Sequence, residues 1–351
     1  MRDYTTKTVY IGIDVHKKSY SVTAVCDRQI VKKDRLPANP NLLADYCKNK
    51  FKGAKIFTAY ESGFCGFSLH RKLVSLGIDN RIVHAAGIEV AVRERVKNDR
   101  RDSEKISTQL AEGRLEGINV PTEEREGYRE ISRLRETFVR KRNRTAAQIK
   151  SFLHRQGLFS EIDDKGLSKN KIELLVKKET GEDISYALCK LCEEWLYLNE
   201  QIEEIKERLK KQGEEDPLEK TYRSLPGIGP TVARVLANEL GDMKQFSNEK
   251  KLFSYIGLTP KEHSSGEHRW LGHISRQGKS IVRKMLVQAA WKAVQVDQGL
   301  EKRFTELSKR IGSRRAMVAI ARIMIGYARC CFRENRMYEE RQKTVTVMAQ
   351  C

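Results

Sequence analysis

Short runs of β-branched and aromatic residues, separated by brief polar turns, fill the first third of the chain. Such runs are typical of strands, and a helical spacing of apolar residues between the later runs predicts helices. The expected elements are, in order, strands over 8–15, 20–26 and 30–36, a helix from Asn41, a strand over 54–61, a helix over 67–76 and a strand over 80–84. With a further helix after them, the order βββαβαβα describes a mixed sheet with helices packed against it, the order of ribonuclease H-like nucleases.

The rest of the chain is predicted to be mainly helical. The chain has seven prolines, and none of them lies over 122–216 or 261–351, so these stretches lack this helix breaker. We therefore expect an α/β plus α protein. Its expected domains are an α/β domain over 1–120, a helical region over 121–216 and a mostly helical domain over 217–351.

One helical stretch carries a heptad pattern. Its apolar residues recur at alternating spacings of three and four, at Leu188, Leu191, Trp195, Leu198, Ile202, Ile205 and Leu209. This spacing forms the a/d seam of a coiled coil. The seam can pair within the chain with the helix over 129–155, or it can pair between chains. We favour a coiled coil between chains, which predicts a homo-oligomer, either a dimer or a tetramer.

The chain carries 67 Lys and Arg against 47 Asp and Glu, a formal net charge of +20. Such an excess favours a polyanionic partner, DNA or RNA. Over 129–155, nine basic side chains accompany only two acidic ones. A solvated charged face is the simpler explanation, but repulsion along one helix favours contact with phosphates. We predict nucleic-acid binding at Arg140, Lys141, Arg142 and Arg144.

The sequence argues against a membrane partner. No stretch approaches the ~18 apolar residues of a membrane span, and the first residues lack the apolar run of a signal peptide. We therefore expect a cytoplasmic protein.

Four acidic residues stand where predicted elements begin or end. Asp14 and Glu61 end two strands, and Asp99 and Asp102 open a helix. Residues three apart share one side of a helix, so the four carboxylates can converge on one site. Crowded carboxylates repel one another unless cations lie between them, and oxygen ligands favour hard ions, so the pattern predicts Mg²⁺ or Mn²⁺. Taken singly, a strand-end Asp is often a turn residue, and Asp99 can simply cap its helix.

The segment over 225–232, LPGIGPTV, predicts a tight turn that opens a helix, as in a helix-hairpin-helix-like motif. Backbone amides at such a helix start can bind a DNA phosphate, which makes Gly227 and Gly229 candidate nucleic-acid contacts. A plain turn between two helices is the alternative.

A polar loop rich in serine, glycine and basic residues is expected over 259–279. A serine hydroxyl attacks phosphate only where its surroundings lower its proton affinity and stabilise the developing charge. Ser265, directly before a glycine, has the least hindered approach, and Arg269, Arg276 and Lys279 are candidate phosphate contacts. From the residues alone, most loop serines are simply solvated.

Seven motifs run in order along nearly the whole chain: GIDVHK, ESG, NDRRDSEK, LPGIGP, FSYIGLTP, SSG and GHISRQGK. In order and spacing they resemble the insertion-sequence transposases of the "one-ten" and "eleven-eleven" group, also described as bridge-RNA-guided recombinases. The resemblance implies a DNA transposase, or site-specific recombinase, that cleaves and rejoins DNA. It also implies a prokaryotic, nucleoid-associated protein.

The resemblance assigns roles to particular residues. It implies that 1–120 form a RuvC-like ribonuclease H fold, whose catalytic and metal-binding DEDD carboxylates are Asp14, Glu61, Asp99 and Asp102. It implies that the C-terminal transposase domain, 217–351, supplies a serine nucleophile, which maps onto Ser265. Tetramers in which the serine of one subunit completes the carboxylate site of another are implied as well. So is a structured guide RNA, the bridge RNA, which pairs with target and donor DNA.

The chain departs from the family pattern in two places. Its third acidic motif reads NDRRDSE where many relatives have TDxxDA, which leaves the acids in place. The SSG motif adds Ser264 beside Ser265, which leaves the choice of nucleophile open. Two other functions are alternatives: a metal-dependent junction nuclease of the RuvC type that uses water, and a noncatalytic RNA-binding assembly protein.

Overall fold

The structure is a computed structural model that describes residues 3–89, 99–158, 166–178, 181–214, 216–265 and 268–338; for 99–100, 263–265 and 268–271 it describes the backbone alone. The chain divides into two compact units, Met1–Val120 and Pro121–Cys351.

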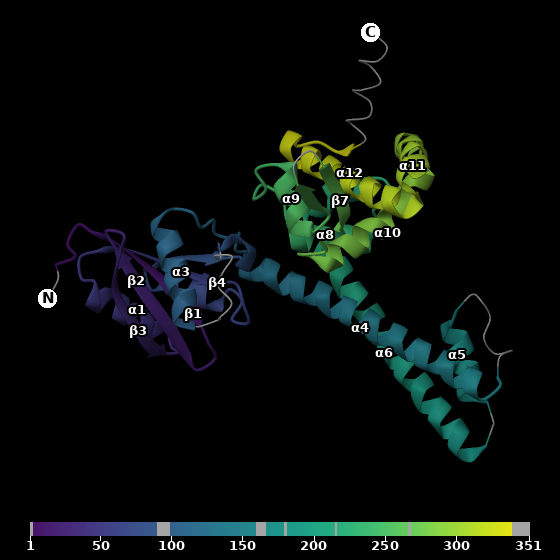
Figure 1. Ribbon diagram of the computed structural model, residues 1–351. Coiled ribbons are helices and arrows are strands. Elements are labelled where there is room, and N and C mark those ends of the chain that lie inside the picture. Colours follow the sequence, from purple (N-terminus) through teal and green to yellow (C-terminus); the bar gives the residue numbers. More distant parts are fainter. Residues whose placement is uncertain are drawn as a thin grey trace, which may run out of the picture. The chain divides into compact units, whose positions relative to one another are not determined.

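The N-terminal unit is a mixed α/β fold (Figure 1). Its elements are β1 (Thr8–Val15), β2 (Ser19–Cys26), β3 (Gln29–Pro37), α1 (Pro40–Lys50), β4 (Lys55–Glu61), α2 (Ser68–Ser75), β5 (Asp79–Val83), a 3-10 turn η1 (Ala85–Gly87) and α3 (Asp99–Ala111). The predicted order is confirmed, with the predicted ends within one residue of the observed ones. Local signals explain the boundaries: Asn39, for example, caps α1 by accepting from the Asn41 amide at 2.9 Å, and Pro40 opens the helix.

The five strands form one sheet in the order β3-β2-β1-β4-β5. Tight turns make the pairs β1/β2 and β2/β3 antiparallel. β4 runs parallel to β1, and β5 runs parallel to β4, because helices cross between these strands. The carboxyl ends of β1 and β4 therefore lie side by side at one edge of the sheet.

Helices cover both faces of this sheet, with α1 on one face and α3 on the other (Figure 1). Ile11 and Ile13 of β1 point toward α1 and α2, with which they form a buried core. Strand residues alternate between faces, so their neighbours point toward α3. On that side Ile106 and Leu110 of α3 pack against Ala59 of β4.

Gly12 lets α3 lie directly on the backbone of β1. A Cβ at Gly12 would lie 2.1 Å from the carbonyl oxygen of Ser103 and 2.5 Å from the amide nitrogen of Ser107. The close approach also brings Ser103 Oγ within 2.9 Å of Thr23 Oγ1, a buried hydrogen bond. The glycine therefore determines where the first turns of α3 stand above the sheet.

Gly12→Ala should displace α3, at a cost of about 1–3 kcal/mol, because both close neighbours are backbone atoms that cannot turn aside. Hydrogen exchange followed by mass spectrometry should show faster exchange in α3 peptides. Gly87→Ala is the matched control, because a Cβ there meets no atom within 4 Å. Equal exchange in the two variants would contradict this packing role.

The C-terminal unit is mainly helical. Its elements are α4 (Glu123–Arg155), α5 (Lys169–Val176), α6 (Glu182–Glu214), α7 (Pro217–Arg223), α8 (Pro230–Leu240), α9 (Glu249–Ile256), β6 (Pro260–Ser265), β7 (His268–Ile274), α10 (Ser280–Val296), α11 (Gln298–Ile311) and α12 (Ser313–Glu334). Residues from all six helices α7 through α12 form the largest buried core of this unit. No helix in the described part of the chain combines the length and apolar character that a bilayer span requires.

The heptad seam of α6 packs against α4 within the chain. Leu188 and Trp195 of α6 share a core with Leu153 of α4, and Arg142 of α4 donates to Asn199 of α6 at 2.8 Å. The later a residue stands in α4, the earlier its contact residues stand in α6, so the two helices are antiparallel. They lie side by side in Figure 1. The favoured pairing of this seam between chains is therefore wrong, and the pairing within the chain is observed. A partner helix on the same chain is already close and costs less entropy to bring into contact.

A buried carboxylate ties three parts of this unit together. The side chain of Glu239, in α8, is completely buried and accepts from Arg133 of α4 at 2.8 and 3.1 Å. Lys279, just before α10, lies 3.4 Å from the same carboxylate. Arg129 of α4 donates to the backbone carbonyls of Asn238 and Glu239. α4 is thereby joined both to α8 and to the segment that leads into α10.

The charges around Glu239 set its ionisation. Burial raises the pKa of Glu239, but the hydrogen bond from Arg133 and the charges of Lys279, Arg133 and Arg129 outweigh burial and leave that pKa below its ordinary value of 4.5. A carboxyl with a lowered folded-state pKa contributes stability above its unfolded pKa. It loses that contribution as the pH falls through the folded value.

Glu239→Gln should destabilise the C-terminal unit by about 3–5 kcal/mol at neutral pH, because Arg133 and Lys279 are left without their buried anion. Urea unfolding can be followed by tryptophan fluorescence, which reports on this unit alone, since all 3 tryptophans lie in it. The difference from wild type should shrink below about pH 4.5. Glu207→Gln, on the exposed side of α6, is the control. A difference that stays constant from neutral to strongly acidic pH would contradict the assignment.

Candidate functional site

Two of the predicted carboxylates stand at adjacent strand ends. Asp14 is the last residue but one of β1, and Glu61 is the last residue of β4. Ile13 is level with Tyr60 in the parallel pair, so Asp14 and Glu61 are the next pair in register and point to the same face. Because Ile13 and Tyr60 point into the core with α1 and α2, the two acids point to the α3 face.

α3 brings a third carboxylate, that of Asp102, to the same edge. Ser103, the next residue of the helix, lies on Gly12, two residues before Asp14. Farther along α3, Leu110 belongs to a buried cluster against which Tyr10, near the start of β1, packs. The helix therefore runs antiparallel to β1, and its N-terminal turn reaches the end of the strand that carries Asp14.

A basic side chain lies beside each of the two half-buried carboxylates. His16 Nε2 is 3.0 Å from Asp14 Oδ2, and Lys105 Nζ is 3.7 Å from Asp102 Oδ1. Glu61 is exposed. His16 and Lys105 are not among the predicted site residues, although their spacing from the two acids is a usable signal. Side chains two apart in extended chain, or three apart on a helix, lie on the same side.

The chemistry of these side chains fits a hard divalent cation. All the predicted ligands are carboxylates, the oxygen donors that Mg²⁺ and Mn²⁺ prefer, and two of them lie beside a basic side chain. Where side chains are described, no three His, Cys, Asp or Glu groups lie close enough together to hold a metal ion. Asp99, the fourth acid of the predicted quartet, begins α3, but its side chain lies outside the described residues.

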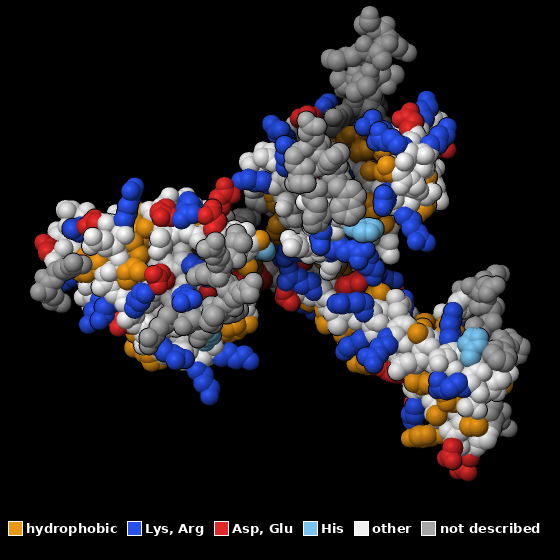
Figure 2. Space-filling model, in the orientation of Figure 1, with side chains coloured by type: hydrophobic (Ala, Val, Ile, Leu, Met, Phe, Trp, Pro, Cys, Tyr) orange, Lys and Arg blue, Asp and Glu red, His pale blue; other side chains and the backbone are white. Residues whose placement is uncertain are grey.

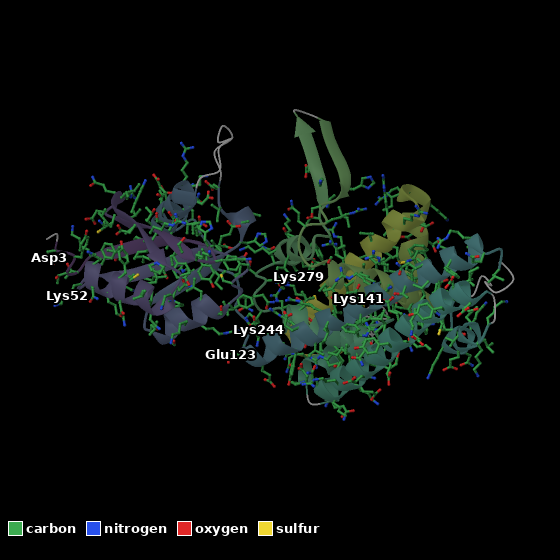
Figure 3. The ribbon with its side chains drawn as sticks, turned by 90° about the horizontal axis from the view of Figure 1, so that it is seen from below. Asp3, Lys52, Glu123, Lys141, Lys244 and Lys279 are labelled. Atoms are coloured by element: carbon green, nitrogen blue, oxygen red, sulfur yellow. The ribbon has the colours of Figure 1, made fainter. Side chains whose placement is uncertain are left out.

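The predicted serine nucleophile lies on a β-hairpin rather than on the expected loop. β6 ends at Ser265, which is level with His268 of β7, and Ser264 is level with Arg269. Figure 3 shows this hairpin standing out from the helices of its unit. The side chains of Ser264, Ser265 and Arg269 lie outside the described residues.

The two predicted phosphate-binding glycines differ in their surroundings. Gly227 has a φ of +72°, and a Cβ there would lie 2.4 Å from the Ala289 carbonyl oxygen and 2.5 Å from the Ala293 nitrogen of α10. Close packing of the turn on α10 therefore explains this glycine. Gly229 is exposed at the start of α8, and a Cβ there would meet no atom within 4 Å. Of the two, Gly229 is the one with an open approach.

The basic candidates divide into engaged and exposed side chains. Arg142 is bonded to Asn199. Lys279 is half-buried beside Glu239, and burial lowers the pKa of its ammonium group although the Glu239 charge acts in the opposite direction. The exposed candidates are Arg140, Lys141, Arg144 and Arg276. Figure 2 shows lysine and arginine side chains gathered along the long helices α4 and α6.

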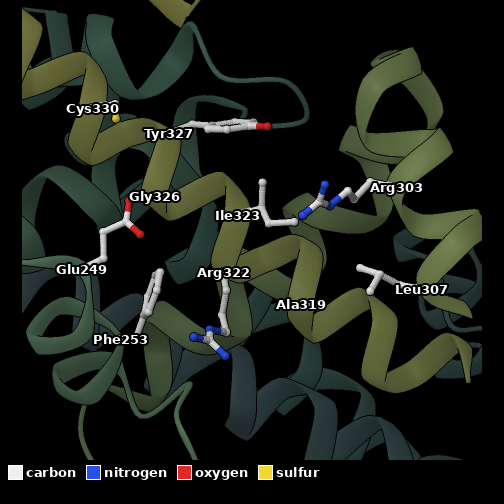
Figure 4. Close-up of a pocket in the computed structure, with 10 residues that line it drawn as sticks. All are labelled: Glu249, Phe253, Arg303, Leu307, Ala319, Arg322, Ile323, Gly326, Tyr327 and Cys330. Atoms are coloured by element: carbon white, nitrogen blue, oxygen red, sulfur yellow. The ribbon is translucent and has the colours of Figure 1, made fainter. Parts of the chain in front are cut away.

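A separate pocket of about 490 Å³ opens between α9, α11 and α12 (Figure 4). In it, the Arg322 guanidinium lies over the Phe253 ring, 4.6 Å from the centroid, and burial lowers the pKa of Arg322 despite the charge of Glu249. None of the predicted catalytic residues lines this pocket. Its position gives it no part in the predicted chemistry.

Two family models match the chain. A model of DEDD transposases of the IS110 type, described as "Transposase", matches residues 11–156. A second model, described as "Transposase IS116/IS110/IS902 family", matches residues 220–305. The first range holds the four predicted carboxylates, and the second holds Ser265.

Curated relatives agree with these models. The transposase for insertion sequence element IS1328 of Yersinia enterocolitica is 29% identical over 232 residues, 66% of this chain and 69% of the relative. The transposase for IS1111A of Coxiella burnetii is 26% identical over 265 residues, 73% of this chain and 72% of the relative. The transposase for IS1533 of Leptospira borgpetersenii is 26% identical over 259 residues, 69% and 72% of the two chains.

The mixed α/β unit and these matches define an insertion-sequence transposase, an enzyme of the class that cleaves and rejoins DNA. Within that class, the chain belongs to the IS110 family, whose relatives include the IS1111 type.

Proposed function

We propose that this transposase exchanges DNA strands by transesterification, with a carboxylate-bound metal in its N-terminal unit and Ser265 of its C-terminal unit as the nucleophile. The observation that carries the proposal is the contact of α3 with Gly12. This contact supports the proposal because it packs Ser103, the neighbour of Asp102, on the strand that also carries Asp14.

Asp14, Glu61, Asp99 and Asp102 would hold Mg²⁺ or Mn²⁺. When bound, such ions stabilise the charge that develops on the attacking and leaving oxygens of a phosphoryl transfer. The acids stand on the sheet and on a helix docked against it, so the chain holds them on rigid elements. Lys105 offsets the charge of Asp102 and thereby reduces the repulsion between the acids.

Ser265 supplies the attacking oxygen. Its Oγ forms a bond to phosphorus while the bond from phosphorus to the 3′ oxygen breaks. The serine gives up its proton, and the leaving oxygen takes one up. The product is a phosphoserine link to DNA and a free 3′-hydroxyl, which reverses the step on a new strand. Each step exchanges one phosphoester for another, so no ATP is consumed. Support for this role comes from the place of Ser265 at the end of β6, where the hairpin turns.

A structured bridge RNA guides the reaction in this proposal by pairing with target and donor DNA. Base pairing then carries the sequence specificity, and protein side chains contact mainly the phosphate backbone. The acids and Ser265 belong to different compact units. A second copy of the chain can therefore supply the serine to the carboxylate site, which makes a dimer or a tetramer the active form.

A denaturing gel of the protein with labelled DNA, copurified RNA and Mg²⁺ tests the proposal. Wild type should give a covalent protein–DNA product, and Ser265→Ala should abolish it. Asp14→Asn and Asp102→Asn should each lower strand cleavage at least about a hundredfold, as expected when an electrostatic stabiliser of the transition state is removed, while nucleic-acid binding persists. Asp45→Asn, an exposed change on α1, is the control and should leave cleavage unchanged.

The other products of this experiment identify the alternatives. Hydrolysed DNA without an adduct, insensitive to Ser265, would indicate a junction nuclease that uses water. The absence of any product would indicate an RNA-binding assembly protein. An adduct that survives Ser265→Ala but not Ser264→Ala would move the nucleophile by one residue. Cleavage that persists in both Asp→Asn variants would overturn the metal assignment.

Changing Arg140, Lys141 and Arg144 together to Gln should weaken nucleic-acid binding, because these α4 side chains are exposed. The slope of log affinity against log salt should flatten by about 0.9 for each duplex phosphate that the variant no longer neutralises. Arg142 stays unchanged, since it bonds Asn199 and helps to hold α4 against α6.

The matched control removes three charges from the N-terminal unit, by changing Lys48, Lys50 and Lys52, which are exposed, to Gln. Affinity can be measured by fluorescence anisotropy over a range of salt concentrations. If affinity and slope fall equally in both triple variants, net charge alone explains the effect and the assignment of α4 is wrong.

A further inference from the structure

One arginine bonds both ends of the β6–β7 hairpin. Arg283, in the first turn of α10, donates through Nη1 to the Ile256 carbonyl at 2.6 Å and to the Gln277 carbonyl at 3.2 Å. Through Nη2 it donates to the Arg276 carbonyl at 2.8 Å. Ile256 lies where the chain enters the hairpin, and Arg276 and Gln277 lie where it leaves. A single guanidinium therefore crosslinks the two ends.

Two glycines allow these ends to touch. A Cβ at Gly257 would lie 1.8 Å from the Gln277 carbonyl oxygen and 2.8 Å from Arg283 Nη1. A Cβ at Gly278 would lie 2.1 Å from the Tyr255 carbonyl oxygen. Both glycines also have positive φ, +75° and +89°. Backbone thus packs on backbone at the base of the hairpin, and no side chain separates the two ends.

The rest of the hairpin depends on this base. β6 and β7 pair chiefly with each other, and a two-stranded hairpin alone is only marginally stable. The hydrogen bond from the Ser275 amide to the Thr259 carbonyl, 2.8 Å, closes the base. Lys279, directly after the hairpin base, joins Glu239 of α8. The direction of the hairpin is therefore set where it leaves the helices.

We propose that Arg283 is a positioning residue for the transesterification: by bonding the carbonyls on both sides of the hairpin, it sets the direction in which the hairpin presents Ser265. The inference rests on the proposed function, because it requires Ser265 as the nucleophile. Arg283 acts through the hairpin and not on the reacting atoms. Lysine cannot replace it, because one ammonium group lacks the planar fork that reaches three carbonyls at once.

Hydrogen exchange of the full-length protein tests the crosslink directly. In Arg283→Lys, peptides over 259–275 should exchange about tenfold faster, since removal of a hydrogen bond to a charged group changes a local opening equilibrium by about that factor or more. Peptides from α8 and α12 should be unchanged. Arg322→Lys is the matched control, a half-buried arginine that bonds none of these carbonyls. Unchanged exchange in the hairpin, or faster exchange throughout the unit, would overturn the proposal.

The single-turnover rate of adduct formation, in the assembled complex with saturating DNA and Mg²⁺, tests the functional role. Arg283→Lys should lower this rate about tenfold to a hundredfold, as expected for a displaced nucleophile, with DNA affinity and melting temperature close to those of wild type. A wild-type rate, or an equal decrease in Arg322→Lys, would overturn the positioning role. An adduct that survives Ser265→Ala would instead overturn the proposed function.

Discussion

The C-terminal unit depends on the ion pairs of one buried carboxylate, that of Glu239. A carboxylate that is buried away from water is stable only beside a positive charge. Arg133 of α4 and Lys279, just before α10, supply this charge. The same contacts connect α4, which packs against α6, to α8. Lys279 also lies directly after the base of the β6–β7 hairpin, which carries Ser265. Basic residues near this centre hold the fold together, and the exposed basic side chains Arg140, Lys141 and Arg144 lie farther along α4.

The N-terminal unit depends on a contact of another kind. At Gly12 the backbone of α3 rests on the backbone of β1, so the helix cannot slide along the strand. Asp102, beside Ser103, is therefore held at a constant level relative to Asp14. His16 lies beside Asp14, and Lys105 lies beside Asp102. The positive charge of Lys105 thus offsets part of the negative charge at this end of the sheet.

Direct contact between backbones recurs in both units and explains why glycines stand in four motifs of this chain. Gly12, Gly227, Gly257 and Gly278 all lie where a Cβ would collide with main-chain atoms of another element. Gly12 positions the helix that carries two of the acids, Gly227 seats the turn before α8 on α10, and Gly257 and Gly278 close the base of the hairpin. Main chain is less adaptable than side chains, so such contacts leave the elements that they join little freedom to move.

The sequence by itself determined the order and the ends of the N-terminal strands and helices, since alternation, turn residues and caps are local signals. It also singled out the acids at the strand ends. Only the tertiary structure decided which helix covers the seam of α6, because a heptad pattern is the same whether its partner lies on the same chain or on another. The expected loop over 259–279 contains the β6–β7 hairpin. The segment has no hydrophobic alternation that would predict strands, and only the backbone pairing and the Arg283 crosslink define the hairpin. Likewise, the sequence pattern predicts that the basic residues of 129–155 share one function. Arg129 and Arg133 instead donate hydrogen bonds to α8, which lies more than a hundred residues later in the chain. Charge and periodicity describe what a segment can do, but packing across long sequence distances selects what it does.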